Sequence, residues 1–216
     1  RNPARHHTIN DSGNKKMDSI ELKKYIRTCG FVCEETAKPI DLFSKIKTAF
    51  RNATLTNERI NKNPTEFYEF FINDKPLSGI LTEFCKLENS LLDNWIGVLG
   101  SFPNKQPELI KIKRLLLEQI TEKEIRDLFP LDLEKYYLDT GIDNYKEELA
   151  DEEIIIYCCA ECGDYDCGGF KIKVEKDKDT FVWTYNDEGR ILQFHFDKKQ
   201  YFNTFDTYRQ TIINKL

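Results

Sequence analysis

Alternating apolar and polar residues in the last third of the chain constrain the fold more than any other feature. Residues 152–159 are apolar on both faces, which is typical of a strand in the middle of a sheet. Residues 170–174 place Phe170, Ile172 and Val174 on one face and two lysines on the other. Two further strand patterns, at 180–185 and 191–196, flank the turn sequence Asn-Asp-Glu-Gly at 186–189. The pattern predicts a four-stranded antiparallel meander.

The segment after the meander has the spacing of a helix instead. Tyr201, Phe205, Tyr208 and Ile212 recur on one helical stripe, which is typical of a helix that buries one face. We therefore expect this helix to close the meander.

The front half of the chain reads mainly as helices. The spacing predicts helices at 18–28, capped by Asp18 or Ser19, and at 40–50. An aromatic strand is expected at 67–72, then an interrupted helical segment at 77–100, a strand or helix at 110–120 and a helix at 121–129. Thr121 and Glu124 have the spacing of a capping box. The fold expected is α+β, one domain over 17–216, with a mainly helical part (17–150) packed against the meander and helix of 151–216.

Charge limits the classes of partner. Residues 1–16 carry four basic residues and one acidic residue and show no periodicity, so we expect an appended tag or a disordered extension. The chain has a formal charge of −5, and without this +3 segment the charge is −8. An acidic chain argues against nucleic-acid binding, which needs a basic surface, and it permits a basic protein partner. No apolar run reaches the roughly 18 residues of a membrane span.

Cysteines are concentrated in the loop after the first meander strand, where Cys159, Cys162 and Cys167 have the opening spacing of a zinc site. A structural zinc site needs a fourth ligand. Cys158 should point to the opposite face from Cys159, and His195 should lie roughly 13 Å away along the fourth strand. Cysteines of the front half (Cys29, Cys33 and Cys85) stay open as ligands. We favour a compact turn built on Gly163, Gly168 and Gly169, with no cofactor, and keep zinc as the alternative. An odd total of seven cysteines fits thiols in the reducing cytoplasm.

Catalytic motifs are missing from the sequence. There is no phosphate-binding glycine loop, no H-E-x-x-H and no G-x-S-x-G. His195 is the single histidine outside the first sixteen residues, so a Ser-His or Cys-His pair has only one possible base, and no cysteine is placed beside it as a nucleophile. We therefore expect a protein that is not an enzyme.

The run IYCCAECGDYDCGGFKIKV, with the later VW and FHFDKKQYFNTFDTY, resembles a family of small bacterial cytoplasmic proteins with a C-x-x-C-G-D-x-x-C-G loop. The upstream EFYEFFINDKPLSGIL resembles an aromatic strand element of the same family. Some members resemble immunity proteins of contact-dependent or polymorphic toxin systems. The resemblance implies an immunity protein that binds a cognate toxin without chemistry of its own. A zinc-binding structural or regulatory module is the alternative.

The meander also predicts where such a partner binds. Its first loop and its 186–189 turn should lie at one end of the sheet. That end would collect five acidic residues as a rim for a basic toxin domain: Glu161, Asp164, Asp166, Asp187 and Glu188. The alternative is that Asp164 and Asp166 only brace the loop while the others are solvated.

Overall fold

The computed structural model describes residues 17–28, 31–34, 65–101, 106–129, 133–160 and 168–214. Residues 1–16, the predicted helix at 40–50 and the middle of the cysteine loop at 161–167 lie outside these ranges. Helices and antiparallel sheets are both present, so the chain is a mixed α+β protein. Within the ranges given above, none of the helices has the length and apolar character needed to cross a membrane.

The C-terminal sheet contains the predicted meander. Its strands are β6 (Glu153–Cys159), β7 (Gly169–Lys176), β8 (Thr180–Asp187) and β9 (Arg190–Asp197), paired antiparallel in chain order. A fifth strand, β5 (Trp95–Gly97), pairs with the outer edge of β6. The interrupted helix expected at 77–100 is therefore wrong in its second half. The apolar run there pairs with the edge of β6, and this long-range pairing decides its conformation.

A second sheet, in the order β2-β1-β3-β4, corrects the prediction of a mainly helical front half. Its strands are β1 (Ile20–Thr28), β2 (Phe31–Glu34), β3 (Thr65–Ile72) and β4 (Lys75–Pro76). The helix predicted at 18–28 is wrong, because β1 pairs with β3 from Ile20 to Arg27. Lys23 and Lys24 of β1 make contacts with β3: the Lys23 Nζ lies 4.0 Å from the Phe71 ring centroid, and Lys24 pairs with Glu66. The strand at 67–72 is confirmed, and a turn with positive φ at Asn73 and Asp74 follows it.

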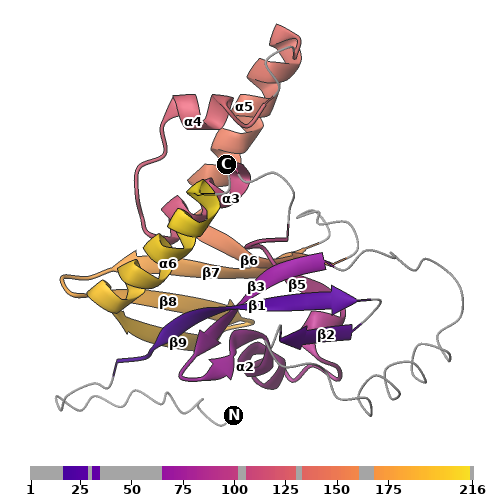
Figure 1. Ribbon diagram of the computed structural model, residues 1–216, viewed down its shortest axis with the longest axis vertical. Coiled ribbons are helices and arrows are strands. Elements are labelled where there is room, and N and C mark those ends of the chain that lie inside the picture. The colour runs from indigo at the N-terminus through magenta and orange to yellow at the C-terminus, as the bar shows by residue number, and fades with distance from the viewer. Residues whose placement is uncertain are drawn as a thin grey trace, which may run out of the picture.

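Helices cover the two sheets and extend from them. They are α2 (Leu77–Phe84), a 3-10 helix (Leu91–Asp93), α3 (Gln106–Leu115), α4 (Glu122–Arg126), α5 (Lys135–Ala150) and α6 (Lys198–Ile213). The helical alternative is thus the right one for the first part of 110–120. Figure 1 shows α6 running diagonally across the sheets and α5 projecting away from them.

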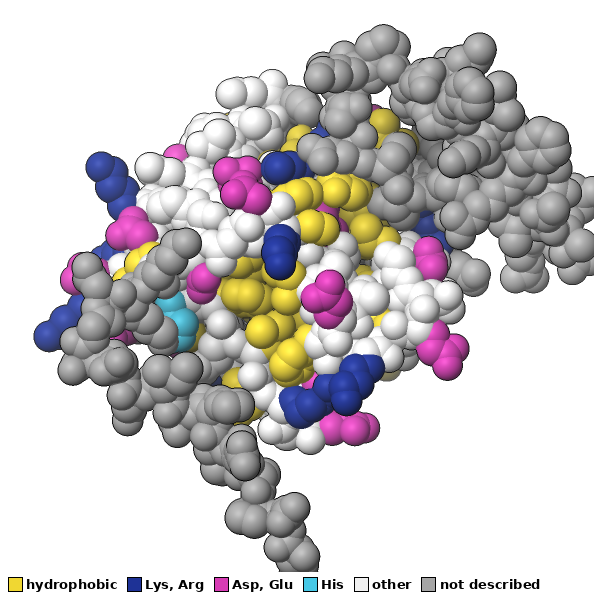
Figure 2. All heavy atoms as spheres, turned by 90° about the horizontal axis from the view of Figure 1, so that it is seen from below, with side chains coloured by type: hydrophobic (Ala, Val, Ile, Leu, Met, Phe, Trp, Pro, Cys, Tyr) yellow, Lys and Arg dark blue, Asp and Glu magenta, His cyan; other side chains and the backbone are white. Residues whose placement is uncertain are grey.

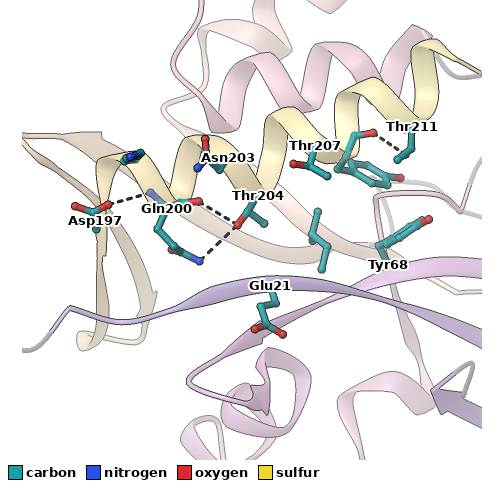
Figure 3. A pocket seen from close by; sticks show the side chains of 11 residues that line it. Glu21, Tyr68, Asp197, Gln200, Asn203, Thr204, Thr207 and Thr211 are labelled. Carbon is teal, nitrogen blue, oxygen red and sulfur yellow. Dashed lines mark hydrogen bonds between the residues drawn. The ribbon is translucent and has the colours of Figure 1, made fainter.

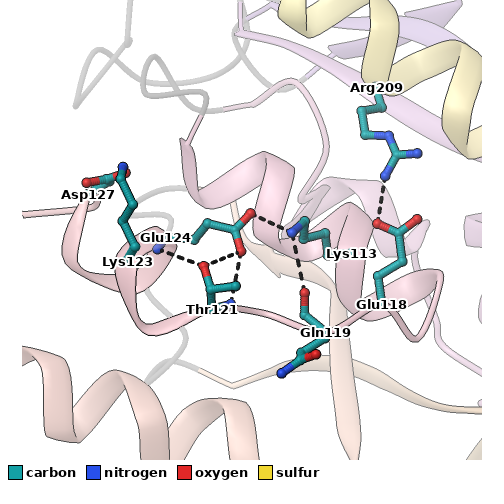
Figure 4. A network of polar contacts seen from close by, with 8 residues as sticks. All are labelled: Lys113, Glu118, Gln119, Thr121, Lys123, Glu124, Asp127 and Arg209. Atoms are coloured by element: carbon teal, nitrogen blue, oxygen red, sulfur yellow. Dashed lines mark hydrogen bonds and ion pairs between the residues drawn. The ribbon is translucent and has the colours of Figure 1, made fainter.

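Polar contacts fix the small helix α4 to its neighbours (Figure 4). The predicted capping box is confirmed, because the Thr121 side chain accepts from the Glu124 amide and Glu124 accepts from the Thr121 amide at 2.9 Å. Glu124 also pairs with Lys113 of α3 at 2.5 Å, and this contact is the main reason that its pKa falls to about 2. Arg209 of α6 holds Glu118 at 2.7 Å in the segment after α3. The first pair ties α4 to α3, and the second ties the segment after α3 to α6.

The core lies where the two sheets and α6 meet. The predicted stripe of α6 is confirmed, since Tyr201, Phe205, Tyr208 and Ile212 are all buried. Phe70 of β3 packs edge-on against Trp183 of β8, with ring centroids 5.4 Å apart. The sheets are also joined at their edges, where Asp18 bridges to Phe196 and Tyr68 bridges to Leu99. One hydrophobic cluster therefore includes residues from both halves of the chain.

Candidate protein-binding surface

The acidic residues predicted from the sequence fall into two groups. Glu161, Asp164 and Asp166 lie outside the described residues. Asp187 and Glu188 lie at the tight turn between β8 and β9, where Glu188 and Gly189 both adopt positive φ. Because β6 to β9 alternate in direction, this turn lies at the same end of the sheet as the end of β6 and the start of β7, which flank the cysteine loop.

Arg190 changes the electrostatics of this turn. Its guanidinium pairs with the Asp187 carboxylate, and it also donates a 2.6 Å hydrogen bond to the Phe84 carbonyl at the end of α2. The same guanidinium lies 5.1 Å from the centroid of the Phe84 ring. Asp187 is thus an internal partner of Arg190, while Glu188 is exposed and presents its charge to solvent.

Four aromatic side chains lie beside the turn in a continuous row, which we call the aromatic strip. It runs from α2 across the sheet to β5 and consists of Phe84, Tyr185, Phe170 and Trp95. Successive ring centroids are 6.0, 5.9 and 5.7 Å apart, and every ring is half-buried. Trp95 reaches the base of the cysteine loop, where a Cβ at Gly168 would lie 3.6 Å from its ring. Sequence patterns missed this strip because its members come from four separate elements.

Hydrophobic residues near the end of α2 add to this surface. Ile80 and Phe84 are half-buried, and Leu87, just past the helix, is 37 % exposed. Figure 2 views the molecule from the side of α2 and shows hydrophobic side chains at the centre of this face, with charged side chains scattered around them. An apolar centre with a charged border is the usual anatomy of a protein interface. We call the aromatic strip, Leu87, Arg190 and Glu188 together the docking face.

The described cysteines are not arranged for chemistry at this face. The Cys85 Sγ lies 3.4 Å from the Tyr185 hydroxyl, and burial is the main cause that raises the pKa of its thiol, so the reactive thiolate is disfavoured. Cys158 is fully buried and Cys159 is half-buried, in agreement with the prediction that they point to opposite faces.

The structure describes only some of the residues that the sequence offered as weak candidates for a zinc site. Cys162 and Cys167 lie outside the described residues. His195 pairs with Val182, toward the opposite end of the sheet from the β8–β9 turn, as predicted. Among the residues that the structure describes, no group of three or more His, Cys, Asp or Glu side chains is placed to hold a metal ion.

The buried side chains of Glu69 and Lys111 lie elsewhere in the molecule and have shifted pKa values. Burial raises the pKa of Glu69 to about 7 and lowers the pKa of Lys111 to about 8. Shifts of this kind occur at catalytic sites. Glu69 is fully buried, however, and one of its oxygens accepts hydrogen bonds from Tyr157 and from the Ser78 amide, so it acts as a core contact.

Comparison of the chain with protein-family models, with curated proteins and with solved structures finds no match.

Proposed function

We propose that the protein is a non-catalytic binding protein of the immunity type, which neutralises a basic bacterial toxin domain in the cytoplasm by holding it on the docking face. The observation that carries this proposal is the aromatic strip, because it lies directly beside Arg190 and the exposed Glu188. Trp, Tyr and Arg are the residues most enriched among those that dominate binding energy at protein interfaces.

The charge of the chain supports a basic partner. The formal charge of −5 becomes −8 without residues 1–16. Such a charge attracts a basic domain over a distance and raises the association rate in a salt-dependent way. Apolar contacts at the aromatic strip would then hold the complex, since desolvated aromatic anchors slow dissociation.

A co-expression experiment tests this function. The product of the gene directly upstream is expressed with and without this protein in the same bacterial host, and growth is measured. The proposal predicts that the upstream product arrests growth and that this protein restores it. An upstream gene for a metabolic enzyme, with no arrest to relieve, would overturn the proposal.

Charge reversal tests the steering role of the turn. Glu188→Lys should slow association most at low salt, and Glu147→Lys, an equal charge change at an exposed position of α5, should slow it less. Asp187 is the poorer test position, because its reversal would also break the pair with Arg190.

A zinc-binding structural or regulatory module remains the second candidate, favoured by the spacing of Cys159, Cys162 and Cys167. It predicts a metal content that the immunity function does not require.

A further inference from the structure

A groove lies between α6 and β1, on a different part of the molecule from the docking face. It has a volume of about 680 Å³, within the range of roughly 300–1,000 Å³ that is usual for small-molecule sites. Figure 3 shows α6 above β1, with the side chains of Gln200 and Thr204 facing the strand. Leu22 and Tyr68 line the groove from the sheet.

The groove is closed at one end by hydrogen bonds to β1. The Gln200 side-chain amide donates to the Ile20 carbonyl at 2.6 Å, and the Thr204 hydroxyl lies 3.1 Å from the same oxygen. These contacts fix the orientation of the Gln200 amide group. Its Oε1 is buried and has no hydrogen-bond partner in the structure, which leaves an acceptor unsatisfied beside the groove.

Further along α6, the groove offers groups that can both donate and accept. The Asn203 amide and the Thr207 hydroxyl line it and make no hydrogen bond within the described part of the chain. At the other end, the rings of Tyr68 and Tyr208 lie with their centroids 4.5 Å apart. The Tyr208 hydroxyl is turned away to the buried Glu108, so its ring carbons face the groove.

Three charged residues, Glu21, Asp197 and Lys199, also line the groove. Asp197 accepts from the Gln200 backbone amide at 2.9 Å as the cap of α6, and Lys199 follows it with an exposed side chain. In Figure 3 the Glu21 carboxylate points away from α6. The other lining residues present hydroxyls, amides and apolar carbon, and two of the three charged ones are acidic, so the groove suits an uncharged ligand better than a phosphorylated one.

We propose that the groove between α6 and β1 binds an uncharged, hydroxyl-rich small molecule of the size of a mono- or disaccharide. Each sugar hydroxyl both donates and accepts, which matches the amide of Asn203 and the hydroxyl of Thr207. Sugar C–H groups would lie against Leu22 and the two tyrosine rings. A peptide fits less well, because an added strand needs free backbone groups and the Ile20 carbonyl is already occupied. The proposal is independent of the immunity function.

Methyl NMR on the full chain tests the groove directly. The methyl groups of Thr204, Thr207 and Thr211 report on it, and Thr140 on α5 serves as a reporter elsewhere. Glucose, maltose and N-acetylglucosamine are titrated separately, with glucose 6-phosphate and an end-blocked trialanine as comparisons. We expect at least one neutral sugar to shift the three groove methyls in a saturable way and to leave Thr140 unchanged.

Substitutions of lining residues test whether the changes in methyl chemical shift come from sugar bound in the groove. Thr207→Val keeps the shape of an exposed side chain and removes its hydroxyl, so the affinity for the sugar should fall about fivefold. Thr140→Val should leave it unchanged. The proposal is overturned if none of the three sugars gives saturable groove shifts, or if Thr207→Val and Asn203→Leu together leave the affinity unchanged. Tighter binding of glucose 6-phosphate or of the peptide would also overturn it.

Discussion

The Tyr157 hydroxyl donates a 2.6 Å hydrogen bond to Glu69 Oε1 in the centre of the core. The same oxygen accepts from the Ser78 amide at 3.0 Å, in the first turn of α2, where Pro76 offers no capping side chain. Glu69 therefore caps α2 from the neighbouring strand. Its second oxygen, Oε2, is buried without a hydrogen-bond partner, so the ionised carboxylate is poorly compensated.

This pair predicts a specific pH dependence of stability. Burial raises the pKa of Glu69 from 4.5 to about 7, so the folded state keeps a proton that the unfolded chain has released. The stability that this proton contributes is present below about pH 4.5 and is lost as the pH rises through 7. A shift of this size corresponds to about 3 kcal/mol.

Urea unfolding of the wild type and of Glu69→Gln at about pH 5 and about pH 8 measures this effect. The variant should lose less stability between the two pH values, because glutamine has no charge to bury. Tyr157→Phe serves as the matched change in the same contact and should keep the pH dependence. Equal pH dependence in the wild type and Glu69→Gln would contradict the prediction.

The hydrogen bonds of Tyr201 predict how much stability is lost when a polar contact in the core is removed. Its hydroxyl accepts from the Trp183 indole N–H at 2.8 Å and donates to the Leu115 carbonyl at 2.8 Å, which links β8, α6 and α3. Tyr201→Phe leaves both partners buried and unsatisfied, so unfolding should become easier by about 1–3 kcal/mol. Tyr136→Phe, at a residue that is 74 % exposed, should have a much smaller effect, because water can take the place of its hydroxyl. If Tyr201→Phe and Tyr136→Phe changed the free energy of unfolding in urea equally, the Tyr201 hydroxyl would not have this stabilising role.

The meander and α6 could be predicted because their patterns are local. The alternation of β7 and the stripe of α6 each report burial on one face. The strand β1 could not be recognised this way, since Lys23 and Lys24 interrupt its apolar pattern and its conformation depends on pairing with β3. The same holds for the docking face. Phe84 and Tyr185 meet only because α2 and β8 pack together, and no spacing in the sequence records that contact.

The positions of the candidate ligands around the cysteine loop predict how much zinc the purified protein contains. We expect purified protein to contain less than one zinc per chain, because Cys158 and Cys159 lie on opposite faces of β6 and His195 lies toward the other end of the sheet. Elemental analysis checks this expectation. One zinc per chain, lost in Cys162→Ser, would refute it and favour the zinc-binding module.

We predict that residues 1–16 can be removed without loss of stability. The described structure begins at Met17, and Asp18 is held by its own backbone hydrogen bond to the His195 carbonyl at 2.7 Å and by its side-chain bonds to His195 and Asn73. Removal of residues 1–16 keeps these contacts, so the melting temperature should stay unchanged. Asp18→Ala in the shortened chain removes the side-chain contacts and should lower it. A large fall on truncation alone would show that residues 1–16 contribute to the fold.

The most direct test of the docking face compares two exposed leucines in binding to the product of the upstream gene. Leu87 comes three residues after Phe84 of the aromatic strip and Leu117 follows α3, and they are 37 % and 46 % exposed. Leu87→Lys and Leu117→Lys change the net charge equally, so a difference between them reports the position of the interface. The proposed function predicts that Leu87→Lys raises the dissociation constant at least about tenfold and that Leu117→Lys leaves it near the wild-type value. A complex weakened by Leu117→Lys and indifferent to Leu87→Lys would place the partner elsewhere and contradict the docking face.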